Sequence, residues 1–175
     1  MIRETSHDAL LMLALGFTCD DLAANRAGQL SEMQHYILRV KRRRSIAIGA
    51  LIVLVCVFVA SLLIFMGGRE NGSAILTVIG IGVTICSAAI MGVFARYWMR
   101  LTVDIQNKSV QAYSGTLERV IKPANRQVMN YMIRVDGAET FVSKEAFETF
   151  DHLIEYTIYR APSTGTLLSA ERLDS

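Results

Sequence analysis

The sequence predicts an α+β membrane protein, with a two-helix transmembrane hairpin, short N-terminal helices and a small C-terminal β-barrel of SH3-like or OB-like type. Two uninterrupted apolar runs predict the hairpin, because each exceeds the ~20 residues that an α-helix needs to cross a hydrocarbon core. A short polar turn separates them, and alternating apolar and polar residues follow the second run. The expected segments are an N-terminal cytoplasmic helical segment (1–44), a first span (45–67), an extracytoplasmic turn (68–72), a second span (73–98) and a cytoplasmic β-rich domain (99–175).

The N-terminal segment contains two helix-start signals. Thr18 with Asp21 forms a capping-box pattern, and Gly28 is a suitable C-terminal stop for the helix that it begins. Ser31 with Gln34 forms a second box. Neither Pro nor Gly occurs between Ser31 and Ile48, so this last helix is expected to run directly into the first span.

The C-terminal segment predicts about six short strands. Alternation at Leu101, Val103 and Ile105 indicates the first of them, and a turn follows at 107–108. Asp136-Gly137 predicts a hairpin, and Ser143 is expected to cap a short helix at 144–150. The other strands are expected near 110–113, 117–121, 129–135, 140–142, 154–158 and 167–168. Strands this short and this close favour a closed or nearly closed barrel, with a split β-sandwich as the alternative.

Basic residues next to the spans predict the orientation of the chain. A cluster precedes the first span, and Arg96 and Arg100 lie at the end of the second, whereas the turn between the spans has one Arg and one Glu. By the positive-inside rule both termini lie in the cytoplasm, and the protein is multi-pass in the inner (cytoplasmic) membrane. The cluster is either a topology determinant alone or also a binding site for anionic lipid head groups; it comprises Arg39, Lys41, Arg42, Arg43 and Arg44.

Small residues recur every four positions along the second span, at Gly80, Thr84, Ala88 and Gly92. Such a face lets another helix approach closely. It either packs the hairpin against itself or associates the chain with a second copy. A transport pathway is disfavoured, because neither apolar run contains an ionisable residue before Arg96.

No residue pattern indicates catalysis, a metal or a cofactor, and we expect none of the three. The three histidines, His7, His35 and His152, lack ligand-spaced partners and are expected on the surface. The three cysteines indicate neither a disulfide framework nor a zinc site. From Arg96 onward the chain has ten Lys/Arg and ten Asp/Glu, so the basic surplus typical of nucleic-acid binding is missing.

Two stretches resemble a known group of proteins. Residues 131–173 contain Asp136-Gly137, Phe141-Val142-Ser143 and Pro162-Ser163, and residues 21–31 read DLAANRAGQLS. Both are similar to segments of uncharacterised small bacterial membrane proteins with two predicted transmembrane spans and a C-terminal β-rich domain. The resemblance implies this architecture and a bacterial origin, and it implies no catalytic residue.

Together these patterns predict a non-catalytic, membrane-anchored interaction or scaffold protein that presents a small cytoplasmic β-barrel. Its expected partners are membrane lipid and either an unknown protein or a second copy of the chain, with no nucleic acid. An open strand edge would permit β-augmentation. The alternative is an accessory subunit of a membrane transporter or protease that acts through its transmembrane hairpin.

Overall fold

The computed structural model describes residues 2–69, 72–125 and 128–173, and it divides the chain into two compact units. One, here the hairpin unit, is Leu38–Val103. The other, here the α/β unit, combines the two ends of the chain, Met1–Ile37 and Asp104–Ser175. Each unit is considered by itself.

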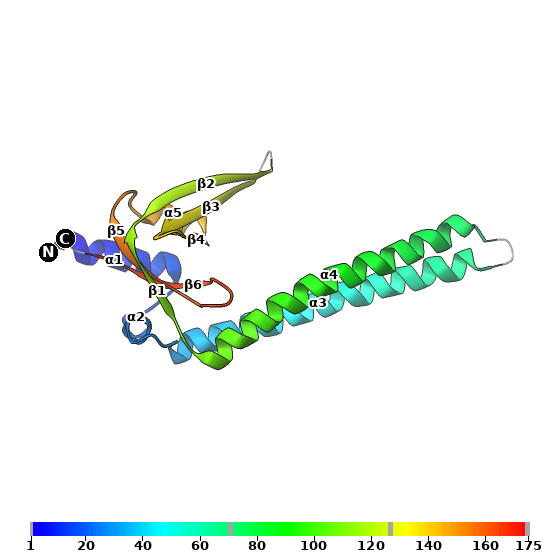
Figure 1. Ribbon diagram of the computed structural model, residues 1–175, viewed down its shortest axis with the longest axis horizontal. Coiled ribbons are helices and arrows are strands. Elements are labelled where there is room, and N and C mark those ends of the chain that lie inside the picture. The colour runs from blue at the N-terminus through cyan, green and yellow to red at the C-terminus, as the bar shows by residue number, and fades with distance from the viewer. Residues whose placement is uncertain (1, 70–71, 126–127, 174–175) are drawn as a thin grey trace. The chain divides into compact units, whose positions relative to one another are not determined.

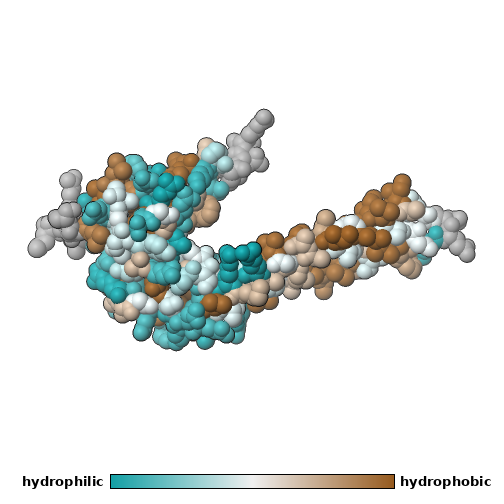
Figure 2. Space-filling view, in the orientation of Figure 1, coloured by the Kyte–Doolittle hydropathy of each residue, from teal (hydrophilic) through white to brown (hydrophobic). Residues whose placement is uncertain are grey.

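Two helices, α3 (Glu32–Gly67) and α4 (Ala74–Asn107), are long and apolar enough to cross a membrane. Their large apolar side chains point outward, so they do not form a buried core as in a soluble helical protein; Leu54 and Val93, for example, are 67% and 73% exposed. In Figure 2 most of the visible hairpin surface is white to brown, which marks residues of intermediate to high hydropathy. This exposure suits helices that are surrounded by hydrocarbon.

Helix α3 runs without interruption from its cap through the basic cluster into the apolar run, as the sequence predicts. The Gln34 backbone N–H donates to Ser31 Oγ at 3.0 Å, and the Ser31 N–H donates to Gln34 Oε1 at 3.3 Å. These reciprocal bonds satisfy two backbone donors at the helix start.

The predicted strand at 101–106 is wrong, because helix α4 continues to Asn107. Leu101 and Ile105 are buried, but Val103 between them is 41% exposed. The buried pair therefore follows the i, i+4 spacing of a helix, which a short alternating run also contains. The expected turn follows immediately, where Lys108 has a φ of 50°.

The α/β unit contains helices α1 (Ile2–Leu15), α2 (Cys19–Arg26) and α5 (Lys144–Thr149) and six strands. The strands are β1 (Gln111–Thr116), β2 (Glu118–Asn125), β3 (Val128–Val135), β4 (Ala138–Phe141), β5 (Glu155–Arg160) and β6 (Leu167–Arg172). They form two antiparallel three-stranded sheets, in the orders β1-β5-β6 and β2-β3-β4 (Figure 1).

The helix caps and the tight turn that the sequence predicts in this unit are confirmed. Thr18 and Asp21 form the capping box of α2. Asp136 and Gly137 adopt φ values of 47° and 73° in the tight turn between β3 and β4. Ser143 accepts a hydrogen bond from the Ala146 N–H at the start of α5.

The expected closed barrel does not form among the described strands. Both sheets contribute to one core, with Ile133 of β3 and Tyr156 of β5 in the same cluster. Helices complete that core, since Leu11 of α1 and Phe147 of α5 belong to it as well. Because helical side chains fill the space between the sheets, the strands need not close on themselves. Two sheets that share one core agree better with the split sandwich than with a barrel.

Candidate functional site

Glycines set the closest approach between α3 and α4 in the hairpin unit. A Cβ at Gly80 would lie 2.7 Å from Cγ1 of Ile64, and a Cβ at Gly49 would lie 2.6 Å from Cζ2 of Trp98. Both distances are shorter than carbon atoms tolerate, so only glycine permits these two contacts. This is the role that small residues commonly have at helix interfaces in membranes.

The four residues of the predicted small-residue face have different surroundings. Gly80 is buried against α3, whereas a Cβ at Gly92 would have nothing within 4 Å. Thr84 and Ala88 line a groove between the helices. The Thr84 hydroxyl donates to the Gly80 carbonyl at 3.0 Å, so its polar atom is satisfied within its own helix.

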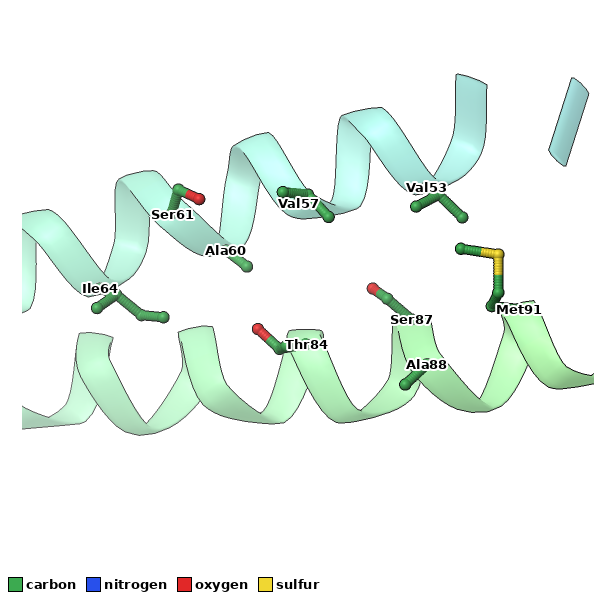
Figure 3. Close-up of a pocket in the computed structure, with 9 residues that line it drawn as sticks. All are labelled: Val53, Val57, Ala60, Ser61, Ile64, Thr84, Ser87, Ala88 and Met91. Carbon is green, nitrogen blue, oxygen red and sulfur yellow. The ribbon is translucent and has the colours of Figure 1, made fainter. Parts of the chain in front are cut away.

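This groove between α3 and α4 has a volume of about 450 Å³. Figure 3 shows Thr84, Ser87 and Met91 of α4 pointing towards α3, and Ala60 of α3 pointing towards α4. The Ser87 hydroxyl donates to the Val83 carbonyl at 2.7 Å, which leaves the groove predominantly apolar in its chemistry. Such a lining suits a hydrocarbon ligand or a helix better than a polar substrate.

A second apolar groove, of about 690 Å³, continues along the hairpin towards its basic end. It begins at Ile46 and Trp98 and includes Ala50 and Phe58. The two grooves share Val53, Val57, Ser61 and Met91 in their linings. The two apolar grooves are therefore adjacent along the hairpin.

A hydrogen-bond network joins the two helices at the basic end of the hairpin. The Trp98 indole N–H donates to Ser45 Oγ at 3.1 Å. Thr102 Oγ1 donates to the Trp98 carbonyl at 2.8 Å and accepts from Arg42 Nη1 at 3.4 Å. Of the predicted basic cluster, Arg42 is half-buried, and Arg39, Lys41, Arg43 and Arg44 are exposed.

The α/β unit buries several polar side chains whose burial sequence patterns do not predict, among them Asp104, Asn25 and His35. Asp104, 1% exposed, accepts backbone N–H bonds from Ser163 at 2.7 Å and Thr164 at 2.8 Å. Asn25 donates to Ser169 Oγ at 2.6 Å. His35 is buried rather than exposed as expected, and its backbone N–H donates to the Ser31 carbonyl in the first turn of α3.

A cluster of three interacting polar side chains links α2 to β6. Arg26 pairs with Glu171, and Tyr159 donates to Glu171 Oε1 at 2.6 Å. Burial, together with the bond to Glu171, raises the pKa of Tyr159 to about 12. Burial by itself raises the pKa of Glu171, but the bonds from Arg26 and Tyr159 outweigh burial and lower that pKa. At neutral pH Glu171 is therefore ionised and Tyr159 is neutral, and the cluster has a structural role in joining α2 to the sheet.

The other histidines also have structural partners. His7 Nε2 lies 2.9 Å from the Tyr156 hydroxyl, and His152 Nδ1 accepts the Arg119 backbone N–H at 3.1 Å. Among the described residues no group of three or more His, Cys, Asp or Glu side chains is placed to hold a metal ion.

Comparison with known proteins found no matching family model, and neither a characterised protein nor a solved structure is significantly similar to the chain.

Proposed function

We propose that the chain is a non-catalytic, membrane-anchored interaction protein. In this proposal the hairpin spans the inner (cytoplasmic) membrane, both termini lie in the cytoplasm, and the α/β unit binds a protein partner. The observation that supports it best is an exposed apolar face on the strand pair β2 and β3 of the α/β unit.

This face lies on the side of strand β3 that faces the core, but at the end of the strand that extends past the core. Ile133 is fully buried, but Met129, on the same side of β3, is 56% exposed. Pro123 of β2 lies opposite Met129, and Ile121 beside it is 53% exposed. Strand β4 pairs only with the Met132–Val135 end of β3, so the other end has β2 alone as its neighbour (Figure 1). We call Ile121, Pro123 and Met129 the β2–β3 face.

Docking of a partner's side chains on the β2–β3 face agrees better with the structure than addition of a partner strand along the edge of β2. The Arg119 N–H, which points to the outer edge of β2, already donates to His152 Nδ1. Pro123, which is oriented to the same edge by strand alternation, has no N–H. Two of the donors that an added strand would need are therefore occupied or missing.

The buried carboxylates also favour a structural protein over an enzyme. Asp104 is satisfied by two backbone N–H groups, and Asp21 accepts from Thr18 and Ser31 around the start of α2. A catalytic carboxylate needs a free oxygen in a cleft that substrate can reach. Both of these side chains instead stabilise the chain around them.

Site-specific photo-cross-linking in intact cells tests the proposal. A photoreactive amino acid at 121 or 129 should yield an adduct of defined mass, because a docked partner covers both positions. The same amino acid at Leu13, which is 81% exposed on α1, is the control and should yield little adduct.

Equal labelling at all three positions, or none at 121 and 129, would contradict the proposal. An adduct of twice the chain mass would identify the partner as a second copy. Point probes suit this experiment better than truncation, because the α/β unit is built from both ends of the chain.

One observation favours the alternative of an accessory subunit that acts through the hairpin. The surface beside Gly92 is open, so a helix of another membrane protein has room to pack there. The substitution Gly92→Leu should then abolish association with that protein. Under the interaction proposal the same variant should leave cross-linking at 121 and 129 unchanged.

A further inference from the structure

We infer that the hairpin unit binds one anionic phospholipid, with an acyl chain in the groove between α3 and α4 and the phosphate held by Arg39, Arg42 and Arg43. The inference requires the hairpin to be in a membrane but does not depend on the partner-binding proposal.

The apolar part of this site is the larger groove, which begins at Ile46 and Trp98. It follows α3 as far as Ser61, a length of about 22 Å at 1.5 Å per residue. One leaflet of a hydrocarbon core is about 15 Å thick. The groove is thus long enough to hold an acyl chain from the membrane surface to the bilayer centre.

The charged part of the site lies on the same face of α3. Arg39, Arg42 and Arg43 precede Ile46 by seven, four and three residues, which are the spacings of neighbours on one helix face. Lys41 and Arg44 fall on other faces of the helix. Because helical side chains incline towards the helix N-terminus, the three arginines reach away from the apolar groove and towards the head-group layer.

Arg42 supplies the second sign of an anionic ligand. Its Nη1 donates to Thr102, but its Nε is buried and has no hydrogen-bond partner among the described residues. A buried N–H without an acceptor is costly, so a rotation of the Arg42 side chain that brings Nε against a phosphate oxygen would be favoured. Arginine is well suited to this role, because its planar guanidinium presents paired donors to phosphate.

Charge complementarity selects an anionic lipid over a neutral lipid or an apolar helix. In Leu38–Val103 the sequence has a single acidic residue, Glu70, and it is 24 residues after Ile46 in the sequence. The basic end of the groove therefore has no carboxylate from its own unit to neutralise it. An apolar helix would fill the groove but leave these cations uncompensated.

The test measures lipid that is bound to the full-length chain. Membranes of phosphatidylcholine with a minor fraction of phosphatidylglycerol are solubilised gently, and the lipid retained per chain is counted by native mass spectrometry. Phosphatidylglycerol should be enriched, with one molecule retained. The double substitution Arg39→Gln and Arg43→Gln should reduce that enrichment roughly tenfold or more, as expected for the loss of charge-assisted hydrogen bonds.

The matched control removes the same charge from other faces of α3, through Lys41→Gln and Arg44→Gln. Its enrichment should change by less than about threefold, because exposed charges act mainly as a screened surface potential. An equal loss in both double variants would overturn the inference, since surface charge alone would then explain the enrichment. No enrichment in the native chain would also overturn it.

A second pair of variants tests the acyl-chain groove without altering charge. Ala50 lines the groove, so Ala50→Leu should lower phosphatidylglycerol retention. Ala89→Leu adds the same volume at an exposed position outside both grooves and should leave retention unchanged. Unchanged retention in both variants would show that the groove is not occupied.

Discussion

Asp104 keeps an almost fully buried carboxylate that has no cationic partner among the described residues. Its two oxygens accept the backbone N–H groups of Ser163 and Thr164, so the end of helix α4 fixes the turn between β5 and β6. Charge-assisted bonds to backbone N–H groups are among the stronger hydrogen bonds in proteins. One side chain thus joins segments that are about 60 residues apart in the sequence.

The variant Asp104→Ala should destabilise the α/β unit by about 2–3 kcal/mol, because it leaves the partly buried N–H groups of Ser163 and Thr164 without their charged acceptor. Hydrogen exchange of the Ser163 and Thr164 amides should accelerate accordingly. The variant Asp104→Asn retains one acceptor oxygen and should therefore destabilise the unit less than Asp104→Ala does. Asp151→Ala is the control: that side chain is exposed in a loose pair with Arg172, and its loss should cost less than about 0.5 kcal/mol. Unchanged exchange at both amides in Asp104→Ala would contradict the assignment.

Sequence patterns predict residue-scale features only where both partners are close along the chain. The box of Thr18 with Asp21 is an example, since three residues of spacing define it. The partners of Asp104 and Asn25 lie far away in sequence. No local signal could therefore identify these contacts, and the burial of His35 was missed for the same reason.

At the scale of elements, the two long apolar helices make their tight contacts at glycines rather than along a continuous small-residue face. Gly80 meets the Ala60–Ile64 turn of α3, and Gly49 receives the Trp98 ring. Between these two contacts the helices leave the apolar grooves. Tight contacts at separate points therefore coexist with space for lipid between them.

Gly80→Val should weaken the hairpin by about 1–3 kcal/mol, because its Cβ would overlap Ile64 and approach the Ala60 carbonyl. The thermal unfolding midpoint in detergent measures the effect. Gly82→Val is a closely matched control on the same helix, since nothing lies within 4 Å of a Cβ there. Equal midpoints for the two variants would contradict this packing.

Most elements could be predicted from periodicity and turn chemistry, and the errors have physical causes. The strand predicted at 101–106 failed because a six-residue alternation also contains the i, i+4 pair of Leu101 and Ile105. The barrel failed because sheet closure depends on which strands pair, and because Leu11 and Phe147 fill space that a barrel would enclose. Neither fact is encoded in any single segment.

At the scale of the whole molecule, both ends of the chain form one unit, and the helical hairpin lies between them in the sequence. The two long apolar helices were predictable because their signal is length and composition alone. The association of α1 and α2 with the strands was not predictable in detail, because it depends on contacts between distant segments.

Membrane topology can be tested with the cysteines of the chain. In a variant without Cys56 and Cys86, the exposed Cys19 should resist a membrane-impermeant maleimide in intact cells and react after permeabilisation. A cysteine placed at Ser73, next to the turn between the spans, should show the reverse pattern. Labelling of Cys19 from outside would contradict the orientation.

The Asn25–Ser169 hydrogen bond has a consequence for biosynthesis. Its two residues are 144 positions apart, so translation at 5–20 residues per second separates their appearance by roughly 7–29 s. At the start of that interval the ribosome has delivered α1, but the strands whose side chains share the core with Leu11 do not yet exist. Pairing of α3 with α4 brings the two ends of the long intervening segment together, as the Arg42–Thr102 hydrogen bond shows, and this lowers the entropic cost of the meeting. The pairing of α3 with α4 thus aids the assembly of a unit that is built from the segments before and after them in the sequence.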